Sequence, residues 1–197
     1  MPDQMIVENC SPTLAGIKTG NLFSVHHEKA PQVRQDLREL NSKIRDKGLR
    51  AVPVRSSDEN TLIYLYRPDF LERDLRKPEV RRILLEKGYP CDSAEQCVAQ
   101  LGRRLSDSAK PFPHEIGLFL GYPPEDVLGF MKDTRNGVKC VGYWKVYGNR
   151  AEAEKTFARF RQCTETCKKE LLNGKSIAEL SVRVRKARPA QAERTSS

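Results

Sequence analysis

The sequence predicts an α+β fold in which a small, mostly antiparallel sheet packs with several helices in a single domain. Residues 49–55 and 61–67 are rich in β-forming side chains, and the polar stretch 56–60 between them predicts a β-hairpin with a longer loop. Segments with helical spacing of apolar residues lie on both sides of this hairpin. The predicted strands are too few and too irregularly spaced for a doubly wound sheet.

The first part of the chain predicts a loop, a short strand and a helix. Residues 10–21 mix glycines with short apolar runs and predict a loop, which leads into a strand near residues 22–25. The next segment is predicted to form an amphipathic helix, with Gly48 placed where helices commonly end. The apolar residues of that helix are Val33, Leu37, Leu40 and Ile44.

Three further helices are predicted between the hairpin and residue 106. The segments 68–75 and 78–87 each begin with a proline, which the first turn of a helix accepts because the missing N–H has no helical partner there. Ser93 and Gln96 belong to a capping-box pattern that opens the third helix.

Residues 112–147 form an unusual block that we expect to hold the functional site. Residues 113–120 predict a short buried helix that stops at Gly121, and residues 124–131 predict a second helix. Residues 138–147 predict the strongest strand in the chain.

A long helix is predicted after this block, with Asn149 as its N-terminal cap. Its apolar stripe consists of Ala153, Phe157, Phe160, Cys163, Cys167 and Leu171. The two cysteines are spaced correctly for two metal ligands, but their place on the stripe favours a position in the core.

Positive charge is concentrated at the end of the chain. Of the formal charge of +9, residues 182–197 carry +4, which leaves only +5 on residues 1–181. We therefore expect a single domain over residues 1–174 and a basic, disordered tail over residues 175–197. This pattern disfavours nucleic-acid binding, apart from weak contacts of the tail.

Composition and motifs exclude several classes of protein. No apolar run approaches the ~20 residues that cross a bilayer, and residues 1–5 do not resemble a secretory signal, so we expect a cytoplasmic protein without a membrane partner. The six cysteines include no C-x-x-C pair. Phosphate-binding loops, dinucleotide-binding glycine motifs, the hydrolase nucleophile elbow and the zincin H-E-x-x-H motif are also absent. The sequence does not identify a cofactor or an oligomeric state.

Two residues are candidates for catalysis. Cys10 lies in the predicted loop, where the charge of Lys18 could lower the pKa of its thiol. His114 begins the predicted helix of residues 113–120, where it could bind an anion, transfer a proton or only cap the first turn. Glu115 could cap the same turn, because acidic side chains suit helix N-termini.

The predicted strand at the end of the block offers candidate binding residues. Its alternation places Tyr143, Lys145 and Tyr147 on one face and Trp144 on the other. Two tyrosines around a lysine could line a pocket or bind phosphate or carboxylate, and they could equally be packing residues of the sheet. Gly142 permits the close approach of a ligand or of another backbone.

The same block resembles an uncharacterised family of anaerobic bacteria that is known only as a domain of unknown function. The resemblance rests on the motifs FPHEIGLFLGYP at residues 112–123 and GYWKVY at residues 142–147, and it extends over Cys10 and most of the chain to about Leu172. It implies that the segments of Cys10, His114 and Trp144 form one constellation, and that the basic tail lies outside the shared function. It implies no particular activity.

Three functions remain open on these observations. We favour a binding or accessory protein for a small anionic or cofactor-like molecule. The expected binding residues are Lys18, Asn21, Glu115, Tyr122, Trp144, Lys145 and Tyr147. The alternatives are a thiol-dependent enzyme that uses Cys10 with His114, or a metal or iron-cofactor accessory protein that uses Cys10, Cys140 and His114.

Overall fold

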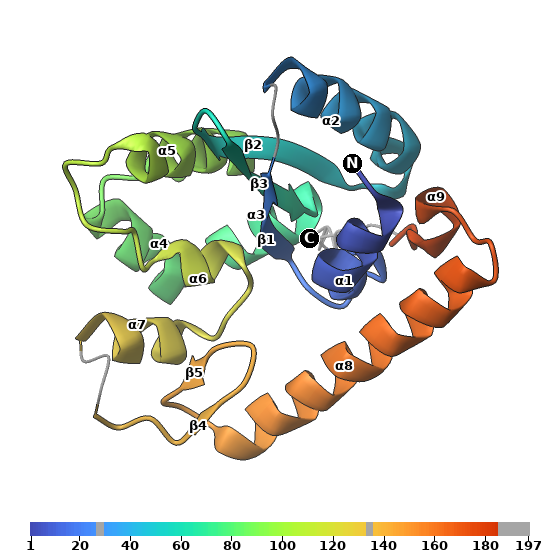
Figure 1. Ribbon diagram of the computed structural model, residues 1–197. Helices are drawn as coiled ribbons and strands as arrows, with labels where there is room; N and C mark the ends of the chain where they lie inside the picture. Colours follow the sequence, from blue (N-terminus) through green and yellow to red (C-terminus); the bar gives the residue numbers. More distant parts are fainter. Residues whose placement is uncertain (27–29, 133–135, 185–197) are drawn as a thin grey trace, which may run out of the picture.

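A three-stranded antiparallel sheet forms the centre of the computed structural model, which describes residues 1–26, 30–132 and 136–184 (Figure 1). The strands are β1 (Gly20–His26), β2 (Arg50–Ser56) and β3 (Asn60–Tyr66), in the order β1-β3-β2. Helices pack on both faces of this sheet, and the predicted α+β class is confirmed.

The central strand β3 determines how the two faces are covered. Its side chains alternate, so that Ile63 and Leu65 point to one face and Tyr64 and Tyr66 to the other. The first face is covered by α1 (Asp3–Leu14) and α2 (Ala30–Ile44), and the core on this side is completed by the C-terminal part of α8 (Arg150–Leu172) and by α9 (Ile177–Leu180), which pack on α1. The second face is covered by α3 (Pro68–Leu75), α4 (Pro78–Glu86), α5 (Ala94–Ser106), α6 (Ile116–Phe119) and α7 (Pro124–Lys132).

The predicted hairpin between β2 and β3 is confirmed. Strand β2 lies at an edge of the sheet, and its pairing with β3 shifts register between Pro53 and Arg55. Proline has no N–H to give to the ladder, and it is accepted at an edge or a bulge because the ladder does not require that N–H there. Before β2, a short 3-10 helix (Arg45–Lys47) ends at Gly48, whose φ of 77° is readily adopted by glycine.

The predicted helix starts are also confirmed. Pro68 and Pro78 occupy the first positions of α3 and α4. The side chains of Ser93 and Asn149 accept hydrogen bonds from the backbone N–H groups three residues further on, at the starts of α5 and α8.

The loop predicted at residues 10–21 is wrong in its first part, because Cys10 lies on α1. Ile6, Cys10 and Leu14 follow one another at four-residue intervals and are all buried against the sheet. Pro12 lies inside this helix and conceals the pattern in the sequence. The burial of this apolar stripe evidently outweighs the disruption by proline in the last turn.

The strand predicted at residues 138–147 is also wrong. The chain instead makes a small hairpin of two-residue strands, β4 (Cys140–Val141) and β5 (Lys145–Val146), and the N–H of Gly142 donates to the carbonyl of Trp144 across 3.0 Å. A Cβ at position 142 would lie 2.3 Å from the Phe157 ring, so the close packing of the turn on Phe157 requires glycine. The predicted alternation of faces therefore does not apply.

The packed chain continues beyond residue 174. Ile177 and Leu180 of α9 are buried, and the N–H of Val182 donates to the carbonyl of Leu14 across 2.9 Å. The remainder of the predicted tail, residues 185–197, lies outside the described residues. Among the helices that the structure describes, none is long and apolar enough to span a membrane.

Candidate functional site

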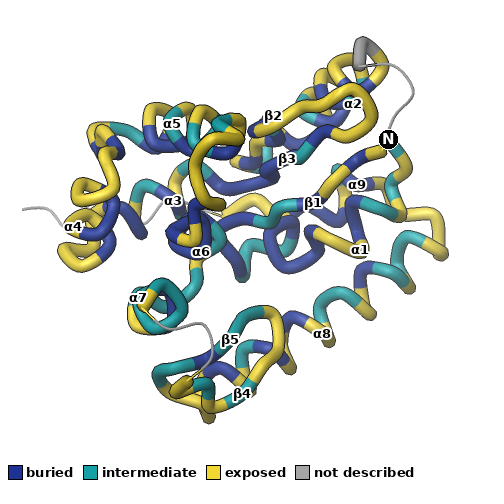
Figure 2. Tube along the Cα trace, turned by 60° about the vertical axis from the view of Figure 1, so that its left-hand side comes forward, coloured by how far each residue is buried: buried dark blue, intermediate teal, exposed yellow. Residues whose placement is uncertain are grey.

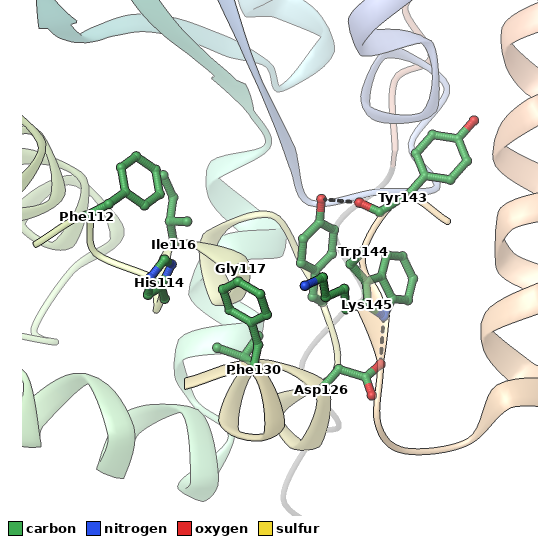
Figure 3. Close-up of a pocket in the computed structure, with 11 residues that line it drawn as sticks. Phe112, His114, Ile116, Gly117, Asp126, Phe130, Tyr143, Trp144 and Lys145 are labelled. Atoms are coloured by element: carbon green, nitrogen blue, oxygen red, sulfur yellow. Dashed lines mark hydrogen bonds between the residues drawn. The ribbon is translucent and has the colours of Figure 1, made fainter. Parts of the chain in front are cut away.

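The two motifs and α7 line a cavity of about 410 Å³ between α6, α7 and the β4–β5 hairpin, which we call the aromatic cavity (Figure 3). Its size falls within the range of small-molecule sites, and its lining is predominantly apolar. The lining residues are Phe112, His114, Ile116, Gly117, Tyr122, Asp126, Val127, Phe130, Tyr143, Trp144 and Lys145. Figure 2 shows that α7 and the hairpin are less buried than the central strand β3, so the cavity belongs to the periphery of the fold.

The close packing of α6 on α7 forms one wall of this cavity. Gly121, with a φ of 76°, ends α6 and reverses the chain towards the prolines that begin α7. A Cβ at Gly117 would lie 2.8 Å from a methyl group of Val127, so only glycine lets the two helices approach this closely.

His114 precedes α6 and Lys145 belongs to β5, and both side chains lie beside the ring of Phe130. The His114 and Phe130 rings meet edge to face, with centroids 4.9 Å apart. The Lys145 ammonium lies 5.4 Å from the centroid of the same Phe130 ring, within the range of a cation–π contact. His114 is exposed and Lys145 is half-buried, so both cavity-lining side chains are accessible to a ligand.

Tyr122 and Trp144 form another wall. Their rings stack with centroids 4.7 Å apart and planes inclined by 28°. The Tyr122 hydroxyl donates to the Tyr143 carbonyl across 3.2 Å (Figure 3), and burial raises the pKa of Tyr122 to about 12. The Tyr122 phenol therefore stays neutral at ordinary pH, and this wall carries no charge.

Asp126 connects α7 to the hairpin. Its carboxylate, which is 3% exposed, accepts from the Trp144 indole N–H across 2.7 Å. It also accepts from the backbone N–H groups of Tyr147 and Gly148, across 2.8 and 2.7 Å. Asp126 therefore fixes the orientation of Trp144 (Figure 3), although the sequence indicated only an acidic residue at a helix start.

Glu115, which the sequence predicted as a binding residue, points away from the aromatic cavity. Its carboxylate is buried and lies 2.8 Å from Nε of Arg104 on α5, and it accepts from the Tyr89 hydroxyl across 3.0 Å. Burial and the Glu115 charge raise the pKa of Tyr89 well above its ordinary value. Glu115 thus anchors the start of the α6 segment to the core.

Cys10, Lys18 and Asn21 do not line the aromatic cavity either. Cys10 is fully buried, and its burial raises the pKa of the thiol far above the ordinary range, against a weaker opposite effect of Lys18. Such a thiol lacks both the exposure and the thiolate character that nucleophilic chemistry requires. Asn21 accepts from the Thr13 hydroxyl across 2.7 Å.

Tyr147 and Cys140 occupy packing positions. A Cβ at Gly129 would lie 2.4 Å from the ring of Tyr147, which shows how closely this ring covers α7. Cys140 packs with Trp144 against the small cluster formed by Val146, Ala153 and Phe157. No group of three His, Cys, Asp or Glu side chains that could hold a metal occurs within the described part of the chain.

Sequence reasoning missed two residues on which the cavity depends, Asp126 and Phe130. The available signal was the spacing of Val127 and Phe130, which places both on one face of α7 next to the two motifs. No local pattern indicated that Asp126 would be buried and would bind three N–H groups.

Comparisons with known proteins identify the family of the chain. No curated protein and no solved structure matches it. A family model described as "Protein of unknown function (DUF3793)" matches residues 6–181, a span that holds both motifs and reaches from α1 to the end of α9. The predicted resemblance to an uncharacterised family is thereby confirmed, and the chain belongs to the DUF3793 family of proteins of unknown function.

Proposed function

We propose that this protein binds a small, flat, cofactor-like molecule with an anionic substituent in the aromatic cavity. One observation carries the proposal: the two motifs, which are separated in sequence, line together with α7 a cavity of about 410 Å³ that has aromatic walls and two cationic side chains, His114 (when protonated) and Lys145. Cavities of this size and composition are typical of small-molecule sites.

The arrangement of the rings favours a planar ligand. Phe130 and the Tyr122–Trp144 pair offer ring surfaces on which a flat molecule can stack or pack edge to face. His114 and Lys145 adjoin Phe130, where they can donate hydrogen bonds to an anionic group at the edge of such a ligand. The apolar part of the ligand would thus be enclosed, and its charge would remain near solvent.

Binding is better supported than catalysis. The Asp126 carboxylate already accepts three hydrogen bonds, so it is poorly placed to act as a base. Cys10 is enclosed in the core, away from the lining of the cavity. Compared with catalysis, a binding or accessory role therefore requires fewer chemical groups beyond the residues that line the aromatic cavity.

Mass spectrometry of the intact protein, purified without oxygen, tests the proposal. We expect the wild-type chain to carry one small molecule whose absorbance extends beyond that of the protein. Phe130→Ala removes a ring from the cavity and should reduce the occupied fraction at least tenfold. Leu172→Ala, which removes an apolar side chain that is 87% exposed on α8, is the matched control and should leave the occupied fraction unchanged.

Two results would contradict the proposal. One is a wild-type protein that carries no small molecule under these conditions. The other is a bound molecule that Phe130→Ala and Leu172→Ala retain equally, since such a molecule would occupy another part of the protein.

A further inference from the structure

A second cavity, of about 420 Å³, lies between the α1–β1 loop, α3 and α8, and we call it the basic cavity. Tyr122 and Trp144 line it as well as the aromatic cavity, but its remaining lining is predominantly polar. Its charged residues are Lys18, Arg73, Asp74, Lys77 and Arg159.

The charges of this cavity do not balance. Asp74 is buried and pairs with Lys77, whose Nζ lies 2.7 Å from its carboxylate, while the Thr19 hydroxyl donates to it across 2.6 Å. The Asp74–Lys77 pair is thus neutral as a unit. The positive charges of Arg73 and Arg159 remain, and Lys18 adds a third when its amine is protonated.

The two arginines approach the cavity from different helices. Arg73 of α3 lies over the ring of Phe70, with its guanidinium 4.7 Å from the ring centroid. Arg159 is exposed on α8 at the opposite side of the cavity. Within residues 1–26, 30–132 and 136–184, neither guanidinium forms an ion pair with a carboxylate. Each fork of N–H donors is therefore able to bind an oxyanion.

Lys18 supplies a buried cation. Its side chain is 5% exposed, donates to the carbonyl of Gly20, and lies 5.3 Å from the centroid of the Tyr122 ring. An ammonium group has three N–H donors, and a single carbonyl accounts for only one of them. Burial lowers the pKa of Lys18 to about 7, so a nearby anion would shift this residue strongly towards its charged form.

We propose that the basic cavity binds the phosphate group of a small phosphorylated molecule, with Lys18, Arg73 and Arg159 as its ligands. A phosphate monoester carries about two negative charges at neutral pH and three acceptor oxygens, which suits three separate cations better than a carboxylate does. The volume leaves room for more than the phosphate group itself. This site is separate from the proposed function, which depends on the aromatic cavity.

Calorimetric titration of the full chain with pyrophosphate, at constant ionic strength and neutral pH, tests this site. We expect one binding site, with acetate binding at least tenfold more weakly than pyrophosphate. Arg159→Gln should raise the dissociation constant about tenfold, because one charge-assisted contact is lost. Arg161→Gln removes the same charge from a position two residues further along α8 that does not line the cavity, and it should change the constant less than twofold.

A wild-type protein that does not bind pyrophosphate would overturn the proposal. Equal weakening by Arg159→Gln and Arg161→Gln would also overturn it, because the attraction would then come from the general charge of α8. Arg73→Gln and Lys18→Met are expected to weaken binding at least tenfold, and the exposed Arg73 keeps the test valid if Lys18→Met fails to fold. Phe130→Ala should leave pyrophosphate binding intact, and loss of binding in that variant would contradict a separate site.

Discussion

Asp126 joins α7 to the β4–β5 hairpin by accepting hydrogen bonds from the Trp144 indole and from two backbone N–H groups. A buried carboxylate is costly unless its oxygens are bound in this way. In return, the bound carboxylate restricts Trp144 to one orientation. The position of Trp144 in the aromatic cavity thus depends on a residue that we do not expect to take part in chemistry.

Replacement of this carboxylate should disrupt the hairpin. Asp126→Ala leaves three N–H donors without their acceptor, and we expect the free energy of unfolding to fall by roughly 3 kcal/mol. Chemical denaturation measures this change. The exposed neighbour Glu125 provides the control, and Glu125→Ala should alter the free energy by less than about 0.5 kcal/mol. Equal effects of the two substitutions would show that the Asp126 contacts add little.

Lys18 should make stability depend on pH. Burial lowers its pKa from 10.5 to about 7, so between these values the unfolded chain binds more protons than the folded chain. The cost of burying Lys18 is therefore fully present below pH 7 and diminishes as pH rises. Burial also raises the pKa values of Cys10 and Tyr122, the titratable groups beside it, so both stay neutral near pH 7 to 8.

Lys18→Met should remove this dependence. The stability difference between the variant and the wild type should change by up to about 1.4 kcal/mol per pH unit from pH 7 upwards, with the variant favoured most at the lowest pH. Denaturation curves collected at several pH values between 7 and 8.5 give this difference. A stability difference that is constant across this range would mean that Lys18 is equally protonated in the folded and the unfolded chain.

At the residue scale, the sequence indicated several residues that line the candidate site but not how the chain brings them together. Tyr122, Trp144 and Lys145 were expected to bind a ligand and His114 to act in catalysis, and all four line the aromatic cavity. Lys18 was expected there too, but the chain places it in the basic cavity. Which cavity a side chain reaches depends on tertiary packing, and no local pattern in a single sequence encodes it.

At the scale of elements, local sequence signals correctly predicted the helices whose ends are determined by interactions within one turn. Prolines at helix starts and caps such as Asn149 act within one turn, so they identified α3, α4 and α8 correctly. Helix α1 and the β4–β5 hairpin were missed because distant partners determine them. The sheet buries the apolar side of α1, and the Phe157 ring of α8 occupies the space beside Gly142.

Because Gly142 lies close to Phe157, we expect the hairpin to be sensitive to a larger side chain at position 142. Gly142→Ala places a methyl group 2.3 Å from the Phe157 ring, so the ring or the turn must move. We expect a loss of stability of roughly 1–3 kcal/mol, the usual cost of overpacking. The control is Val141→Ala on the same hairpin, where the side chain is 70% exposed and the loss should be smaller. Thermal unfolding followed by circular dichroism distinguishes the two.

At the scale of the whole molecule, Arg67 connects both ends of the described chain. Its guanidinium is buried and donates to the carbonyls of Thr13 and Leu14, across 2.8 and 2.7 Å, and to the carbonyl of Val182 across 2.8 Å. Burial lowers the pKa of Arg67 to about 10, so it remains charged at neutral pH. The region after α8 therefore contributes to the same core as α1 (Figure 1).

Truncation tests this connection. A chain that ends at Gly174 loses α9 with its buried Ile177 and Leu180, and it leaves Arg67 without the Val182 carbonyl. Each apolar side chain is worth about 1.5–3 kcal/mol, so the free energy of unfolding should fall by at least roughly 3 kcal/mol. A chain that ends at Val184 keeps these contacts and is the control. Equal stability of the two truncated chains, measured by urea denaturation, would contradict a structural role for α9.

The most direct test of the aromatic cavity uses Trp144, the only tryptophan in the chain. Anilinonaphthalene sulfonate is an aromatic anion with a flat naphthalene ring, and its binding beside Trp144 would quench the indole emission by energy transfer. We predict a saturable titration with one site in the wild type, weakened at least tenfold by Phe130→Ala and unchanged by Leu172→Ala. Absence of saturable transfer, or equal affinity in the Phe130→Ala variant, would contradict a ligand site between the two motifs.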